Sequence, residues 1–132
     1  MSSCGEYVEQ FKRTNNMKKS LKYMIPLRSK VSIYVPSTNN VNEQVDNSAM
    51  VDYVHTTLSR FFGGATCAPA IGGWVSESGE LVKERVTIVY AFCTDEQLER
   101  YDEDIISVCE KIKKDMAQEA VSLEVNGELY FI

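Results

Sequence analysis

The stretch LVKERVTIVYAFCTDEQ, residues 81–97, decides the fold of this chain. Residues 81–93 alternate in the manner of a strand, and both faces of the second half are apolar, which is typical of a central strand. Thr94 and Gln97 follow with the spacing of a capping box, in which each side chain bonds the other residue's backbone N–H. An apolar stripe with helical spacing then continues to about residue 117. The stretch therefore predicts a central strand that leads directly into a long amphipathic helix.

The other expected elements are arranged around this unit. Working outward, the sequence predicts a strand at 30–35, a polar loop at 36–47, a helix at about 48–62, an irregular strand at 65–76, a strand at 119–125 and a short last strand from Glu128 to Ile132. Pro69 inside the irregular strand indicates a sheet edge or a bulge. Strand, helix, two strands, helix and strand is the ferredoxin-like βαββαβ order. We therefore expect an α+β fold whose antiparallel sheet carries its helices on one face.

Charge divides the chain into two parts. We expect residues 1–28 to form a basic N-terminal helical extension, with a weak helix over 5–24, and residues 29–132 to form the ferredoxin-like domain. The first 30 residues carry a net charge of +5, whereas residues 31–132 carry −10. A basic arm can meet nucleic acid or an acidic surface, or it can lie as a solvated helix against its own acidic domain. The acidic body argues against nucleic acid as the main partner, because phosphate contacts dominate such binding.

The composition excludes several classes of protein. With 132 residues, 44% of them hydrophobic and 25% charged, the chain has the size and balance of one globular domain. No apolar run reaches the length of a membrane span and the N-terminus has no secretory signal, so we expect a cytoplasmic protein without a membrane partner. The four cysteines have no C-x-x-C spacing and His55 is the only histidine, so we expect neither a metal site nor a cofactor.

An antiparallel sheet with helices on one side leaves its other face to be covered. The alternation assigns Tyr34, Thr87, Val89 and Ala91 to that face. Two arrangements would cover it. The chain could form a homo-oligomer, for which closed cyclic forms are usual and for which we favour a trimer, or the N-terminal helix could fold across the sheet.

The glycine-rich segment from Phe62 to Trp74 is the most distinctive part of the chain. Glycines let the backbone approach a ligand closely, and the single tryptophan can stack on a ring. The candidate ligand-binding residues of this segment are Gly63, Gly64, Thr66 and Trp74. The alternative interpretation is a bulged sheet edge with a core tryptophan. Nucleotide motifs such as the P-loop are absent from the sequence.

Two carboxylates are candidate catalytic residues. Glu84 falls on the same side of its strand as Val86 and Ile88, where a charge is costly unless it is paired. Glu119 stands at the junction between the long helix and the strand that follows it. If the two carboxylates meet, one of them would have a raised pKa, as acid–base catalysis requires. The alternative is that both are rim charges.

The strings FFGGAT, GGW and QEAV, together with Glu84 at the start of the central strand, resemble a group of small ferredoxin-like proteins of phages, plasmids and bacterial genomes. Most of that group has no assigned function, and the resemblance covers about residues 31–132. The group is similar to phage enzymes that degrade S-adenosylmethionine, which are oligomeric and place the ligand between subunits. By this resemblance, Gln118 would hold the polar edge of the ligand, and Glu119 and Glu84 would hold its cation or act as base. Where those enzymes have a tyrosine near the glycine-rich loop, this chain has Ala65.

Two functions remain open at this point. In the first, the chain is a counter-defence protein of a mobile element and binds a small nucleotide-like ligand in a subunit-interface pocket, with S-adenosylmethionine lyase chemistry as a further option. The expected lining of that pocket is Trp74, Glu84, Gln118 and Glu119. In the second, the chain blocks a host defence protein, such as a CRISPR nuclease, through its acidic surface. Glu119→Gln would abolish activity in the first case and be silent in the second, where charge reversals on the long helix would matter.

Overall fold

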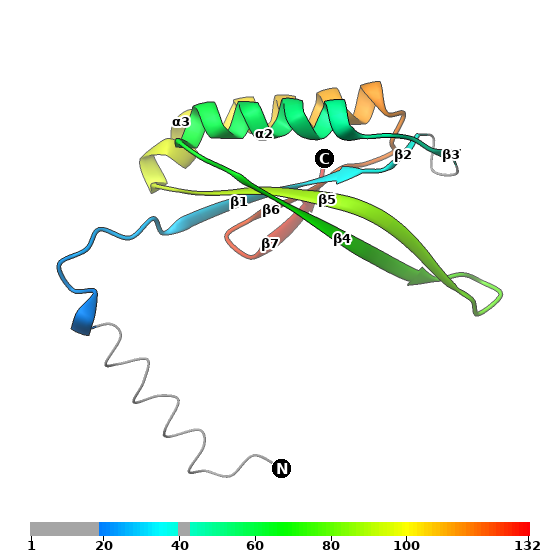
Figure 1. Ribbon diagram of the computed structural model, residues 1–132, viewed down its shortest axis with the longest axis horizontal. Coiled ribbons are helices and arrows are strands. Elements are labelled where there is room, and N and C mark those ends of the chain that lie inside the picture. The colour runs from blue at the N-terminus through cyan, green and yellow to red at the C-terminus, as the bar shows by residue number, and fades with distance from the viewer. Residues whose placement is uncertain (1–18, 40–42) are drawn as a thin grey trace, which may run out of the picture.

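The computed structural model describes residues 19–39 and 43–132 of the chain. Its body is a five-stranded antiparallel sheet in the order β4-β5-β1-β6-β7, with two helices on one face (Figure 1). The strands are β1 (Ser29–Pro36), β4 (Thr66–Val75), β5 (Leu81–Cys93), β6 (Ser122–Val125) and β7 (Glu128–Phe131). The helices are α2 (Ser48–Phe62) and α3 (Asp95–Asp115), and a two-stranded ribbon pairs β2 (Thr38–Asn39) with β3 (Glu43–Gln44).

The strand order confirms the ferredoxin-like α+β prediction. β1 and β5 form the central pair, β6 lies on the other side of β1, and β4 lies at the edge. β7 continues the sheet beyond β6 as the predicted short last strand. Pro69 fits β4 because an edge strand tolerates the missing backbone N–H. The strand itself is less irregular than expected, since it pairs with β5 without interruption from Thr66 to Val75.

Both helices begin or end where local signals in the sequence place them. α2 ends at Gly63, which has a φ of 85° and whose N–H donates to Ser59 O at 2.8 Å. α3 begins at the predicted capping box, in which the Gln97 N–H donates to Thr94 Oγ1 at 3.1 Å and the Thr94 N–H donates to Gln97 Oε1 at 2.9 Å. Within the described residues, neither helix combines the length and the apolar character that a membrane crossing requires.

Two segments differ from the prediction or lie outside the described chain. The polar loop expected at 36–47 contains the β2–β3 ribbon, which is fastened by the Val45 N–H donating to Ser37 O at 2.9 Å. Most of the helix expected at 5–24 lies outside the described residues. The part that is described is helical only at Lys19 and Ser20.

The core lies between the helices and one face of the sheet. On the sheet side it is formed by the buried side chains of Val31, Ile33, Val35, Val89, Ala91 and Leu123. The assignment of Val89 and Ala91 to the uncovered face is therefore wrong, and so is that of Thr87, which shares their side of β5. Tyr34 does lie on the uncovered face, where it pairs with Ile88. The alternation alone could not decide between two faces of β5 that are both apolar.

The other face of the sheet, which we call the open face, carries no helix (Figure 1). Residues that pair directly across antiparallel strands share a face, and the strand register assigns to this face Tyr34, Trp74, Glu84, Val86, Ile88, Tyr90, Phe92, Leu129 and Phe131. Phe92 is 50% exposed, Trp74 is 52% exposed and Phe131 is 72% exposed. Single exposed apolar residues are ordinary, but a contiguous group of this kind marks an interaction surface.

Candidate functional site

The turn between α2 and β4 brings three predicted ligand-binding residues together. Gly63 ends α2, Gly64 and Ala65 follow, and β4 begins at Thr66. The His55 Nε2–H donates to Ala65 O at 2.8 Å, which holds the turn against α2. His55 is therefore a structural residue of this turn rather than a candidate catalyst.

A cavity of about 350 Å³ lies beside this turn, and we call it the glycine-turn cavity. Gly63, Gly64 and Thr66 line it together with the rings of Tyr90 and Phe92 and the side chain of Leu27, which precedes β1. The two rings lie edge to face with centroids 6.2 Å apart. A planar ligand group could therefore enter between backbone atoms and aromatic faces.

The aromatic lining was not predicted as part of a site. Tyr90 and Phe92 belong to the alternating pattern of β5 and looked like ordinary strand residues. The Nζ of Lys30 lies 4.9 Å from the centroid of the Tyr90 ring and 5.8 Å from that of the Phe92 ring. The sequence indicated only that Tyr90 and Phe92 share one face of β5. That observation points to a site once the structure shows that no helix covers this face.

Glu84 and Trp74 lie at the other end of the open face, on the long β4–β5 hairpin. Glu84 pairs with Gly72 and Trp74 pairs with Val82, so both side chains project from the same face as Tyr90. Glu84 is half-buried, and the glycine opposite adds no side chain beside its carboxylate. At ~3.3 Å per residue, Glu84 lies about 20 Å along β5 from Tyr90.

Gln118 and Glu119 lie in the segment between α3 and β6, beside the end of β1. The Nε2 of Gln118 donates to Thr38 O at 2.8 Å and to Met116 O at 3.0 Å. On the opposite side of β1, Ser37 Oγ donates to Arg85 O at 2.5 Å. Gln118 and Arg85, the residue next to Glu84, are therefore both hydrogen-bonded at the C-terminal end of β1. They lie on opposite sides of that strand.

The predicted carboxylate pair is consequently separated by a strand. Glu84 is half-buried on β5, whereas Glu119 is exposed in the segment that leads to β6. Neighbouring strands lie about 4.8 Å apart, so a side chain on β5 and one beside the far side of β1 are about 10 Å apart at the backbone. A ligand of a few rings could bridge them, but they do not form a direct dyad within one protomer.

One protomer thus divides the predicted site into two groups. Gly63, Gly64 and Thr66 lie at one end of the sheet, and Glu84, Gln118 and Glu119 lie at the other, with Trp74 further out on the hairpin. A small ligand cannot touch both ends of the same protomer.

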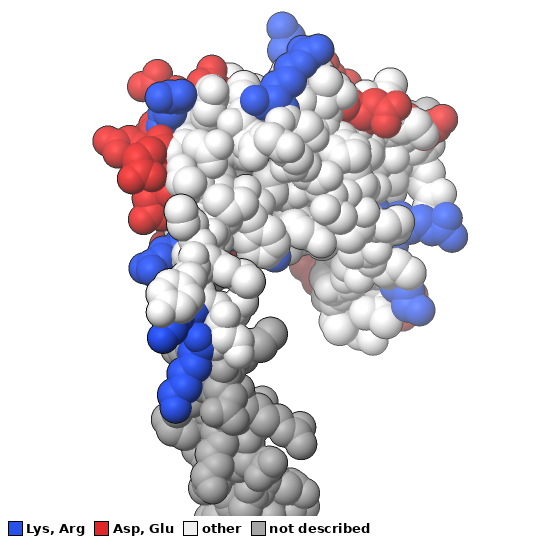
Figure 2. All heavy atoms as spheres, turned by 60° about the vertical axis from the view of Figure 1, so that its left-hand side comes forward, with Lys and Arg blue, Asp and Glu red and all other residues white. Residues whose placement is uncertain are grey.

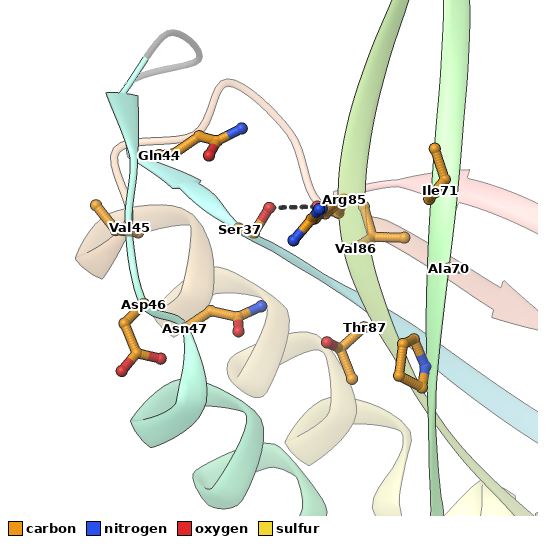
Figure 3. A pocket seen from close by; sticks show the side chains of 11 residues that line it. Ser37, Gln44, Val45, Asp46, Asn47, Ala70, Ile71, Arg85, Val86 and Thr87 are labelled. Atoms are coloured by element: carbon orange, nitrogen blue, oxygen red, sulfur yellow. Dashed lines mark hydrogen bonds between the residues drawn. The ribbon is translucent and has the colours of Figure 1, made fainter.

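A second cavity of about 530 Å³ lies near the β1 end that Gln118 flanks (Figure 3). Arg85 and Thr87 of β5 face Ser37 and Asn47 across it. No residue that the structure describes forms an ion pair with Arg85. Asp46 also lines this cavity, and hydrogen bonds from Ser48 hold the pKa of its carboxyl below the ordinary range. The sequence offered no signal for this cavity, because it depends on how the segment 36–47 folds.

The cysteines of the described chain do not supply a nucleophile. Burial, with a smaller effect of Glu110, raises the pKa of the Cys109 thiol to about 12. Burial also raises the pKa values of Cys67 and Cys93, helped by Asp52 and Asp95 respectively. A thiol is a poor nucleophile while it keeps its proton. Nor does any part of the described chain bring three or more His, Cys, Asp or Glu side chains together as a metal site would.

Comparisons with known proteins identify the fold on which these groups are placed. A family model described as "Protein of unknown function (DUF3574)" matches residues 30–129. No curated protein matches the chain. The basic residues before position 30 lie outside the family match.

Two solved structures share the fold. A phage SAM lyase in complex with S-methyl-5'-thioadenosine superposes with a TM-score of 0.57 at 17% identity, covering 79% of this chain and 88% of that chain. A phage SAM lyase in the apo state superposes with a TM-score of 0.57 at 19% identity, covering 79% of this chain and 87% of that chain. These findings confirm the resemblance that the glycine-rich strings and the QEAV segment indicated, and at this identity they show the fold alone.

Proposed function

Because the chain belongs to the DUF3574 family of proteins of unknown function, we propose its function from its geometry. We propose that it binds a small nucleotide-like ligand at an interface between copies of itself. The observation that carries this proposal is the division of the candidate residues between the two ends of one sheet, whose open face exposes several large apolar side chains.

An interface on the open face would reunite the two groups. In a closed ring each copy presents one end of its contact surface to the next copy. The glycine-turn cavity of one protomer would then be completed by Glu84, Gln118 and Glu119 of its neighbour, with Trp74 at the rim. We favour a trimer as the ring. Burial of the exposed aromatic side chains of this face would stabilise the trimer, since apolar burial contributes about 25 cal/mol per Å².

The residues on each side suit different parts of such a ligand. Tyr90 and Phe92 offer aromatic faces to a base, and Gly63 and Gly64 admit a ligand close to the backbone. Thr66 adds a hydroxyl group. The lining of the glycine-turn cavity therefore supports a ligand with a flat, apolar ring system.

The opposite end supplies the polar groups. The Nε2 of Gln118 is held by two carbonyl groups, which leaves its Oε1 to accept a hydrogen bond from the ligand. Glu84 and Glu119 would hold a cationic group or act as base. The phage SAM lyase that shares this fold has been solved with S-methyl-5'-thioadenosine, which supports a nucleoside as the ligand class.

The proposal includes a biological context. We place the protein in the cytoplasm as a counter-defence protein of a mobile element, and S-adenosylmethionine lyase activity is the enzymatic form of the same proposal. Both rest on the shared fold of the phage enzymes. Turnover of S-adenosylmethionine by the purified protein would distinguish an enzyme from a binding protein.

A second candidate function rests on the acidic surface. The exposed acids of the first half of α3 include Glu99, Asp102 and Glu103, and they could cover a basic groove of a host defence protein. In that case charge reversals at these residues would abolish protection of the mobile element, and Glu119→Gln would have no effect. The ligand proposal expects Glu119→Gln to abolish activity and the charge reversals on α3 to have no effect.

Subunit complementation tests the shared site directly. Gly64→Trp would fill the glycine-turn cavity; a Cβ at position 64 meets no atom within 4 Å, so the fold should tolerate it. Glu84→Lys would destroy the other half of the site. Calorimetric titration with S-methyl-5'-thioadenosine and with S-adenosylmethionine would be made on each variant and on the two variants expressed together.

The two variants should each bind no ligand, because every site in either oligomer lacks one half. In oligomers mixed at random about a quarter of the sites combine two intact halves, so binding at about that stoichiometry should return. A mixture that stays silent while the wild-type protein binds would place the whole site within one protomer. A wild-type protein that binds neither probe would overturn the ligand itself.

A further inference from the structure

The segment 19–28, which we call the arm, exposes apolar and basic side chains together. Tyr23 is 87% exposed, Ile25 is 90% exposed and Met24 is 65% exposed. Three residues of the arm are basic, namely Lys19, Lys22 and Arg28, and none is acidic. The arm leaves the body at the start of β1 and runs away from the sheet (Figure 1). Leu27 lines the glycine-turn cavity of its own protomer, but no apolar side chain of the arm belongs to the hydrophobic core that the described residues form.

An apolar groove of about 400 Å³ lies between α3 and the outer strands β6 and β7. Its apolar lining includes Leu98, Ile105, Ile106, Leu123 and Tyr130. Ile106 is 39% exposed and Tyr130 is 46% exposed. The groove faces the helix side of the sheet, so it is separate from the open face that the ligand proposal uses.

The rim of this groove is acidic. Asp102 and Glu103 line it directly, and Glu99 lies on the preceding turn of α3, exposed like both of them. Figure 2 shows acidic side chains gathered on the body above the root of the arm, whose own exposed charges are basic. Opposite charges arranged in this way set partner choice and register at an interface.

We infer that the arm of one copy docks in the α3–β7 groove of a neighbouring copy. The groove would take apolar side chains such as Met24 and Ile25, while Lys22 and Arg28 would meet the acidic rim. The arm has ten residues and, when extended, spans about 33 Å, which is enough to reach a second molecule. The arm precedes residue 30, where the family match begins, so the family model does not include it.

The groove is separate from the proposed ligand site, although Leu27 of the arm also lines the glycine-turn cavity of its own protomer. The contact uses the helix side of the β7 edge rather than the open face, and none of the charged residues that it needs lines the glycine-turn cavity. Ligand binding by the wild-type protein is measured separately, so failure of one proposal does not imply failure of the other.

Disulfide trapping between two differently tagged full-length chains tests the docking. One chain carries Ile25→Cys and the other carries Ile106→Cys, and the mixture is oxidised mildly and separated by mass. A matched control chain carries Glu77→Cys, an exposed position on the β4–β5 turn that is remote from the groove. Unsubstituted chains give the background from the native cysteines.

Covalent dimers of the two tags should exceed those with the Glu77→Cys control by about tenfold. Reversing the arm charges with Lys22→Glu and Arg28→Glu should lower the yield at least about fivefold, and adding Asp102→Lys and Glu103→Lys on the groove chain should restore it. A yield equal to the control would overturn the inference. A disulfide found only within single chains that carry both substitutions would also overturn it, since the arm would then occupy its own groove. A yield that charge reversal leaves unchanged would overturn it as well.

Discussion

At the scale of single residues, Glu84 is a charge whose position needs a partner. It is half-buried on an apolar face, opposite a glycine, and a carboxylate there is costly to keep unless something pairs with it. In the proposed site that partner is the cationic or polar end of the ligand.

Glu84→Gln should therefore weaken ligand binding while sparing the fold. Loss of a charge-assisted hydrogen bond costs about 1.5–3 kcal/mol, so the affinity for S-adenosylmethionine should fall at least about tenfold. Calorimetric titration measures it, with Glu77→Gln on the exposed turn as the matched control. An unchanged affinity in Glu84→Gln would remove this residue from the site.

Cys109 gives a prediction on pH. Burial raises its pKa to about 12 in the folded protein from the ordinary thiol value of 9.0, so above pH 9 the unfolded chain loses a proton that the folded chain keeps. The free energy of unfolding should then fall as pH rises from 9 towards 11, by up to about 1.4 kcal/mol per pH unit for this thiol. Urea denaturation at several pH values measures the slope, and Cys109→Ala should reduce it. An identical slope in the variant would contradict the assignment.

At this scale the structure shows how the candidate residues are grouped, and their roles stay predictions. Gly63, Gly64 and Thr66 do meet at one cavity, because they are neighbours in the chain. Glu84 and Glu119 do not form a direct pair, because that required knowing which segments border β1. Tyr90 and Phe92 were missed since an apolar strand residue has no local mark of exposure.

At the scale of elements, local signals fixed the boundaries of the helices. The glycine after Phe62 and the capping box before α3 act over a few residues, and both lie where they were expected. The β2–β3 ribbon was not predicted, because strands of two residues carry no periodicity. The face of β5 was assigned wrongly because both of its faces are apolar, and only the position of the helices distinguishes them.

The capping box of α3 can be tested by Thr94→Ala. Removal of an N-cap side chain costs about 1 kcal/mol, so the urea midpoint should fall accordingly. Thr57→Ala is the matched control, because the Thr57 hydroxyl is exposed and only donates back to Tyr53 O within α2. Equal losses in both variants would show that the cap has no special contribution.

At the scale of the whole molecule, the open face determines what one protomer can do alone. The proposed oligomer rests on two features of one copy. Several large apolar side chains of the open face are half-exposed, and the candidate site residues lie at opposite ends of the same sheet. Periodicity predicted that some face would stay uncovered. It could not predict that the candidate residues would be divided between the two ends of the sheet, because their separation follows from the length of β5 and the position of α2.

Phe92→Glu should dissociate the oligomer without unfolding the protomer. The side chain is 50% exposed, so the core loses little, whereas a charge at a buried interface costs several kcal/mol. Sedimentation measures the mass and circular dichroism measures the fold. Ile71→Glu is the control, since Ile71 is 69% exposed and pairs with Arg85 on the other face. If Ile71→Glu dissociated the oligomer and Phe92→Glu did not, the interface between copies would not lie on the open face.

The most direct test of a ligand held between copies is the native mass of the full-length protein as it is purified from cells. The proposed function predicts a closed ring, with a trimer favoured, that carries a nucleotide-like molecule of a few hundred daltons per subunit. It also predicts that stripped protein regains this mass when S-methyl-5'-thioadenosine or S-adenosylmethionine is added. A bare monomer that binds neither compound would contradict it.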